Sequence, residues 1–165
     1  MADQIAEWFH ILPKELVTVV IAMLPIAELR GAIPWALTQP PIGGGLNWET
    51  AYIFAVIGNL LPVVPLLLFF EKTYLFLDRY SFFHRFFVWL FARTQRRSKM
   101  VEKYKAVGLV LFVGIPLPIT GAWTGSLAAF LFGIRFRYAF PAIIAGVLLS
   151  GTIVTLASLG VIALF

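Results

Sequence analysis

The sequence predicts an all-α integral membrane protein, and three observations lead to this fold class. Of the 165 residues, 61% are apolar and only 13% are charged, about half the charged share of a soluble domain. Three windows, 50–70, 106–134 and 138–165, contain no Asp, Glu, Lys or Arg. Each window reaches the roughly 20 residues that a spanning helix needs. The length suits a single membrane domain that covers residues 1–165.

The basic residues indicate how the chain is oriented. Eight of the thirteen Lys and Arg residues lie between residues 79 and 105. The positive-inside rule places such a cluster on the cytoplasmic side, so we expect residues 71–105 there and a span at 48–70 that runs inward. Nucleic-acid binding is the alternative for a basic cluster, but it does not suit so apolar a chain, and we expect no nucleic-acid partner. The stretch 72–92 is aromatic-rich and charged, which favours an interfacial amphipathic helix between the two halves of the chain.

The window 106–134 is too long for a simple span. As one helix, its 29 residues would extend about 43 Å, whereas the hydrocarbon core is about 30 Å thick. Pro116 and Pro118 do not suit a helix interior, and Gly121 and Gly125 weaken the helix that follows them. A long kinked span is one interpretation. The other is a re-entrant hairpin, which returns Arg135 and Arg137 to the basic side. The charge rule favours the hairpin, followed by a span at 138–163.

The first apolar region, about 14–39, leaves the same two interpretations open. It is either one helix kinked at Pro34 or a hairpin whose break includes Gly31 and Pro34. The charges on either side of this region do not decide between the two. The loop at 38–48, rich in Pro and Gly, is expected outside the cell.

The two halves of the chain, 12–70 and 106–165, resemble each other weakly. The motifs that match are "RGAIP" (30–34) with "TGAWT" (120–124) and "GNLLP" (58–62) with "GVLLS" (146–150). If each half holds a hairpin, the hairpins enter from opposite sides and the halves form an inverted repeat. Paired interrupted segments of this kind indicate a transport site near the bilayer midplane. A bundle of proline-kinked helices without a central cavity is the alternative.

Glu28 and Arg30 are charged residues well inside an apolar stretch. An intramembrane charge costs at least about 2.5 kcal/mol. The pair is either an ion pair that fixes the break or a binding site, in which Glu28 carries a proton and Arg30 binds an anionic head group. We favour the binding site, because a buried ion pair is a poor source of stability.

Further site residues are expected in both halves. The candidates for contact with a substrate or proton are Asn59, Thr120, Trp123 and Thr124. Arg135 and Arg137 either only mark the cytoplasmic side of the membrane or dock a lipid phosphate, which arginine binds through two parallel hydrogen bonds. No cofactor or metal site is predicted, because His10 and His84 are isolated and cysteine is absent. Neither a nucleotide-binding loop nor a nucleophile with its base is visible, so no enzymatic activity is expected.

The motifs "ELRGAIP" (28–34) and "PLPITGAWTGSLAA" (116–129) resemble those of the small multi-drug export proteins. That family distantly resembles the DedA (SNARE-associated/VTT) superfamily of re-entrant-hairpin membrane proteins. The resemblance implies transport, with translocation of lipids such as polyprenyl phosphates as its more specific form. Glu28 matches the acidic residue of the first hairpin. A second acidic residue, usual in the first half of DedA-type proteins, has no intramembrane counterpart here, since Glu49 lies at the edge of a loop.

The sequence thus predicts a multi-pass transporter of the cell membrane that moves an amphiphilic substrate. An anionic lipid phosphate, such as a polyprenyl phosphate or a phospholipid, is the first choice of substrate. A small multidrug or cation exporter driven by an ion gradient is one alternative, and a membrane scaffold or assembly factor without transport is another. Membrane lipids and a second copy of the chain, in a homodimer, are the expected partners.

Overall fold

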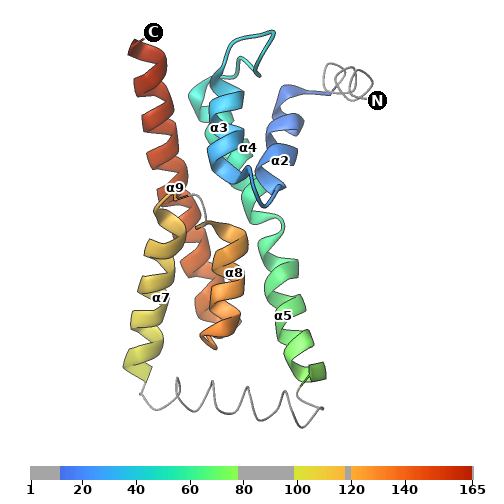
Figure 1. Cartoon of the computed structure of the whole chain (residues 1–165), viewed down its shortest axis with the longest axis vertical. Helices are drawn as coiled ribbons and strands as arrows, with labels where there is room; N and C mark the ends of the chain where they lie inside the picture. Colours follow the sequence, from blue (N-terminus) through green and yellow to red (C-terminus); the bar gives the residue numbers. More distant parts are fainter. Residues whose placement is uncertain (1–11, 78–98, 118–119, 165) are drawn as a thin grey trace. The chain divides into compact units, whose positions relative to one another are not determined.

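The computed structural model describes residues 12–77, 99–117 and 120–164, and it is all-helical with no strand in these ranges. The predicted all-α class is therefore confirmed. The helices in this part of the chain (Figure 1) are α2 (Lys14–Met23), α3 (Glu28–Leu37), α4 (Trp48–Leu60), α5 (Val63–Leu77), α7 (Lys99–Gly114), α8 (Ala122–Leu131) and α9 (Phe136–Leu164). The interfacial helix expected within 71–105 falls largely outside the described residues. Pro118, His10 and His84 also lie outside the described residues.

Two helical stretches are long and apolar enough to cross a membrane. They are Trp48–Phe70, with 23 residues, and Phe136–Ala163, with 28 residues. They coincide with the spans expected at 48–70 and 138–163. The first stretch contains a two-residue turn at Leu61 and Pro62 that separates α4 from α5.

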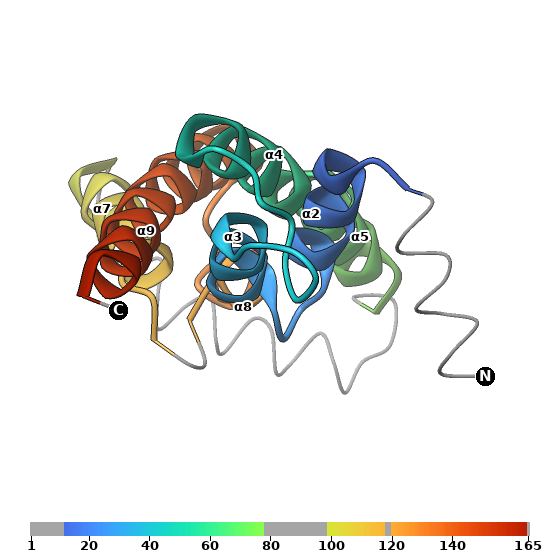
Figure 2. The same cartoon turned by 90° about the horizontal axis from the view of Figure 1, so that it is seen from above.

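The chain divides into two compact units. The first consists of Met1–Leu61 together with Leu148–Phe165, and the second is Pro62–Val147. Helices α2, α3 and α4 belong to the first unit and pack against one another in all three pairings. Figure 2 shows them nearly end-on, with α3 beside both α2 and α4. The second half of α9 completes this unit.

Glycine sets the distance between α2 and α4. A Cβ atom on Gly58 of α4 would lie 2.8 Å from Val19 Cα and 2.9 Å from Ala22 Cβ. Those separations are far shorter than real carbon contacts, so the two backbones approach each other only because Gly58 has no side chain. Small residues allow the same close approach between helices in membranes generally.

The second unit is built from α5, α7, α8 and the start of α9. Helix α8 packs against both α5 and α7, and Phe70 stacks on Phe130 with ring centroids 5.5 Å apart. The side chain of Val113, which is 1% exposed, faces Gly125 of α8 and Gly146 of α9. Figure 1 shows α7 and α8 side by side and running in opposite directions.

The first helix break lies earlier than the sequence suggested. Helix α3 continues through Gly31 and Pro34, so the prediction that these residues break a hairpin is wrong. The chain turns at residues 24–27 instead. Leu24 is extended, with φ −72° and ψ 133°, because a following proline disfavours the helical conformation of the residue before it. Pro25 therefore ends α2, and the Gly31 N–H joins the turn to α3 by donating to Ala27 O at 2.8 Å.

The second break is at the predicted place, with one exception. Pro116 and Gly121 lie in the segment between α7 and α8. Gly125, predicted to contribute to this break, is instead inside α8. Its N–H donates to Gly121 O at 2.8 Å, and its missing side chain makes room for Val113. Gly125 therefore serves packing rather than interruption.

The loop between α3 and α4 folds back onto the end of α3. Gly44 N–H donates to Trp35 O at 2.9 Å and Leu46 N–H to Ala36 O at 2.8 Å. These bonds satisfy carbonyls that a helix end would otherwise leave without partners. Asn47 then begins α4, because its side chain accepts a hydrogen bond from Thr50 N–H at 2.8 Å.

Candidate functional site

Glu28 is a buried acid at the first position of α3. Its exposed fraction is 4%, and its φ is +44°, in the left-handed region that costs a non-glycine residue about 1–2 kcal/mol. The partial positive charge at a helix N-terminus favours an acid at this position. Backbone strain of this kind persists where the surrounding fold imposes it and concentrates at functional sites. Glu28 therefore combines two costly features, burial and strain, in one residue.

Arg30 and Asn59 lie in the same unit as Glu28. Arg30 is half-buried on α3, two positions along, a spacing at which side chains do not share a helix face. Asn59 is 1% exposed on α4. Its Oδ1 atom is enclosed and has no hydrogen-bond partner in the part of the chain that the structure describes. Buried amide oxygens are normally paired, so Asn59 is a candidate acceptor for a bound ion or substrate.

In the second unit, Thr120 holds the segment between α7 and α8. Its Oγ1 donates to Ile115 O at 2.6 Å and accepts from Leu117 N–H at 3.0 Å. One hydroxyl thus adds bonds to two backbone groups that also bond each other, with Leu117 N–H donating to Ile115 O at 2.8 Å. Thr120 was predicted to contact a substrate, but in this conformation its hydroxyl is engaged with the backbone.

The other hydroxyls near the second break also bond to their own helix. Thr124 Oγ1 donates to Gly121 O at 3.4 Å, and Ser126 Oγ donates to Ala122 O at 2.8 Å. Ser126 is fully buried, while Trp123 and Thr124 are half-buried. These side chains lie at the start of α8, within and just after the motif "TGAWT".

Basic side chains gather where α8 ends and α9 begins. Arg135 and Arg137 are exposed there, and the Arg137 guanidinium lies 4.7 Å from the centre of the Tyr138 ring. Lys105 Nζ donates to Phe132 O at 3.1 Å, as cations often do at the carbonyl end of a helix. Lys105 also lines a cavity of about 280 Å³, together with apolar residues of α7, of α8 and of the turn after α8.

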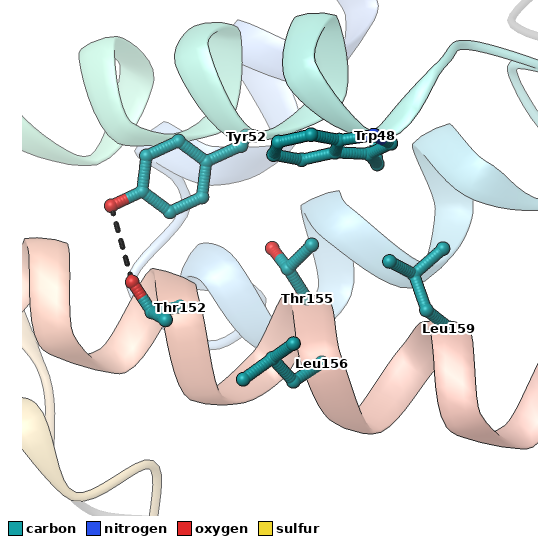
Figure 3. Close-up of a pocket in the computed structure, with 6 residues that line it drawn as sticks. All are labelled: Trp48, Tyr52, Thr152, Thr155, Leu156 and Leu159. Carbon is teal, nitrogen blue, oxygen red and sulfur yellow. Dashed lines mark hydrogen bonds between the residues drawn. The ribbon is translucent and has the colours of Figure 1, made fainter.

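The structure also reveals a cavity that was not predicted from the sequence. Its volume is about 300 Å³, and it lies between α4 and α9 within the first unit. Six residues line it: Trp48, Tyr52, Thr152, Thr155, Leu156 and Leu159 (Figure 3). The spacings of four between the aromatics and three between the threonines place each pair on one helix face. These spacings were the feature of the sequence from which the cavity could have been predicted.

The predicted site residues thus divide between the two units. Glu28, Arg30 and Asn59 belong to the first unit, whereas Thr120, Trp123, Thr124, Arg135 and Arg137 belong to the second. Among the residues that the structure describes, no group of three His, Asp or Glu side chains could hold a metal ion.

Comparison with known proteins identifies the family. A family model described as "Putative small multi-drug export protein" matches residues 28–153, which is more than half of the chain. The chain belongs to this family. The match begins at Glu28. Membership of this family, together with the two apolar helices, indicates a membrane exporter. No curated protein and no solved structure matches the chain.

Proposed function

We propose that this family member exports amphiphilic cations and that Glu28 binds cation and proton in turn. Two re-entrant hairpins, α2–α3 and α7–α8, would bring the break of each helix pair to membrane depth. The main support for this proposal is Glu28 itself, an acid that is 4% exposed and has a positive φ. A carboxylate in such a place attracts a cation and releases it when protonated, which is the alternation that proton-driven export requires.

The apolar character of both turns supports the hairpins. Residues 24–27 are Leu, Pro, Ile and Ala, and Ile26 is 91% exposed. In the second turn Leu117 is 53% exposed. Loops that lie in water are usually rich in Ser, Asn, Asp and Gly, and the loop after α3 carries Gly43, Gly44, Gly45 and Asn47. Irregular backbone with apolar side chains suits a position inside the membrane, covered by protein or beside a wet cavity.

Matched glycines support the internal repeat. Gly58 and Gly146 occupy the same place in "GNLLP" and "GVLLS". In its own unit, Gly58 of α4 receives the backbone of α2, and Gly146 of α9 receives Val113 and Val110 of α7. In both halves, the long apolar helix therefore uses this glycine to admit the first helix of the pair.

Translocation of an anionic lipid phosphate is the second candidate. Lys105, which lines a largely apolar cavity near the end of α8, and the exposed Arg135 and Arg137, which follow α8 in the sequence, favour it. Arginine binds phosphate through paired hydrogen bonds, and the cavity would take an alkyl chain. Under this candidate the arginines, rather than Glu28, govern the substrate.

Liposomes that contain the purified full-length chain separate the two candidates. Movement of ethidium, a hydrophobic cation, and of NBD-labelled phosphatidylglycerol is followed under an imposed pH gradient. We expect ethidium transport, and at least about a tenfold loss with Glu28→Gln, because the amide cannot exchange a proton. Glu49→Gln is the matched control, since Glu49 is an exposed acid at the start of α4.

The outcomes are distinct. Ethidium transport that survives Glu28→Gln contradicts the proposal. Phosphatidylglycerol movement that depends on Arg135 and Arg137 but not on Glu28 supports the lipid candidate instead. If neither probe moves, transport of both substrate classes is rejected and the role of a scaffold is favoured.

A further inference from the structure

Thr155 differs from four other hydroxyl side chains of the described residues. Thr18, Thr38, Ser126 and Thr152 each donate their hydroxyl to the carbonyl four residues earlier, at 2.8–2.9 Å. Thr155 is 5% exposed, and its Oγ1 has no hydrogen-bond partner in the described part of the chain. A buried hydroxyl without a partner is costly, so this side chain requires an explanation.

The Thr155 side chain faces the cavity between α4 and α9. Figure 3 shows it pointing from α9 toward the helix face that carries Trp48 and Tyr52. The Oγ1 atom is covered, but Thr155 lines the cavity. Rotation by about 120° about the Cα–Cβ bond moves the hydroxyl to the position of the methyl group and the methyl group to that of the hydrogen, and we infer that such a rotation presents the hydroxyl to a ligand.

The cavity is held open by contacts on one side. Tyr52 Oη donates to Leu148 O at 3.1 Å and lies 3.5 Å from Thr152 Oγ1. A Cβ atom on Gly151 would lie 2.9 Å from Tyr52 Cε2, so the Tyr52 ring packs against α9 at this glycine. Tyr52 therefore fixes α4 on α9, and the space beyond it, toward Trp48 and Leu159, is left as the cavity.

We infer that this cavity binds a small neutral amphiphile that carries a hydroxyl or a similar hydrogen-bonding group. The apolar side chains of Trp48, Leu156 and Leu159 take the hydrocarbon part, and Thr155 supplies the hydrogen bond. A volume of about 300 Å³ is at the lower end for ligand sites, which favours a small molecule. The lining described here carries no charge, which favours a neutral ligand over a cation or a phosphate.

A lipid acyl chain is the competing occupant. It would fill the apolar space equally well, but it offers no hydrogen bond and leaves Thr155 unexplained. The inference is independent of the proposed export function, because binding at this cavity is measured without transport and involves neither Glu28 nor Arg30.

Photolabelling of the full-length chain in lipid nanodiscs tests the inference. The probes are an octanol that carries a diazirine and the corresponding octane, and adducts are mapped by mass spectrometry. We expect the octanol to label α4 and α9 around Trp48 and Leu159 and the octane to label them less. Thr155→Val should lower labelling by octanol about fivefold to tenfold, the equivalent of one hydrogen bond, while Thr155→Ser should retain it.

Thr18→Val is the matched control. Thr18 is equally buried in the same unit, but its hydroxyl already donates to Lys14 O at 2.8 Å, and it is outside the cavity. Its labelling should equal that of the unmodified chain. The melting temperature of Thr155→Val should not fall, because the change removes an unpaired polar group.

Three results would overturn the inference. One is equal labelling of this cavity by octane and octanol, which indicates an acyl-chain site. Another is unchanged labelling of Thr155→Val by octanol. The third is a lowered melting temperature of that variant, which would mean that the hydroxyl stabilises the folded chain.

Discussion

The helix pairs α2–α3 and α7–α8 both turn an apolar chain, but they use different groups to do so. In the first pair, backbone bonds hold the turn, with Glu28 N–H donating to Leu24 O at 3.0 Å. In the second pair, the Thr120 hydroxyl bonds two backbone groups of the turn. The first pair also carries a buried acid, Glu28, at the start of α3. The hydroxyls described at the second turn serve the backbone.

The two units also differ in how a glycine admits a neighbouring helix. Gly58 of α4 receives the backbone of α2, whereas Gly125 of α8 receives the side-chain tip of Val113. A side chain can be shortened to relieve a clash, and a backbone cannot. The two regions should thus respond differently to the same glycine-to-alanine change.

The largest expected effect is at Gly58. Gly58→Ala places a methyl group against Val19 O and Cα, and such overpacking should destabilise the first unit by about 3 kcal/mol. The measurement is thermal unfolding in detergent. Gly160→Ala on α9 is the control, because open space surrounds that glycine, and it should gain up to about 1 kcal/mol from helix propensity. Equal stability of the two variants would mean that α2 and α4 are not in backbone contact.

A smaller and reversible effect is expected at Gly125. Gly125→Ala alone directs its methyl group at Val113 Cγ2 and should cost about 2 kcal/mol. Combining it with Val113→Ala removes the clashing atom and refills the space. The double variant should recover most of the lost stability, with a coupling free energy of about 1–2 kcal/mol. Strict additivity in this double-mutant cycle would contradict the contact.

The smallest effect is at Thr120. Thr120→Val removes the side-chain bonds to Ile115 O and Leu117 N–H and leaves these groups only their bond to each other, which should cost about 1 kcal/mol in thermal unfolding. Thr120→Ser keeps the hydroxyl and should cost less than half as much. If serine and valine are equally destabilising, the methyl group rather than the hydroxyl holds the turn.

The fold was predictable where a single physical rule dominates. The spans at 48–70 and 138–163 followed from length and hydropathy, and the break at Pro116 and Gly121 followed from residues that helices tolerate poorly. The first break was misplaced because two prolines, Pro25 and Pro34, compete for it. Pro34 is accommodated inside α3, whereas Pro25 sets the extended conformation of Leu24. Amino-acid composition alone does not show which of these two prolines ends a helix.

The candidate site was likewise predictable only where one physical rule dominates. Glu28 stands out because a charge in an apolar run is rare, and the structure places it in a buried, strained position. The role of Gly125 depends on Val113, twelve residues away in sequence, and the cavity at Thr155 depends on two helices about 100 residues apart. Such pairings arise from tertiary packing, which local patterns do not encode.

The central claim is that the acid of the first pair serves substrate and the hydroxyl of the second pair serves the fold. Comparing transport by Glu28→Gln with transport by Thr120→Val tests this claim most directly. Ethidium flux in liposomes is divided by the amount of folded protein. We predict at least about a tenfold loss for Glu28→Gln at an unchanged melting temperature, and a flux within about twofold of normal for Thr120→Val despite its lower stability. The reverse pattern, with flux lost at Thr120 and retained at Glu28, would contradict the account.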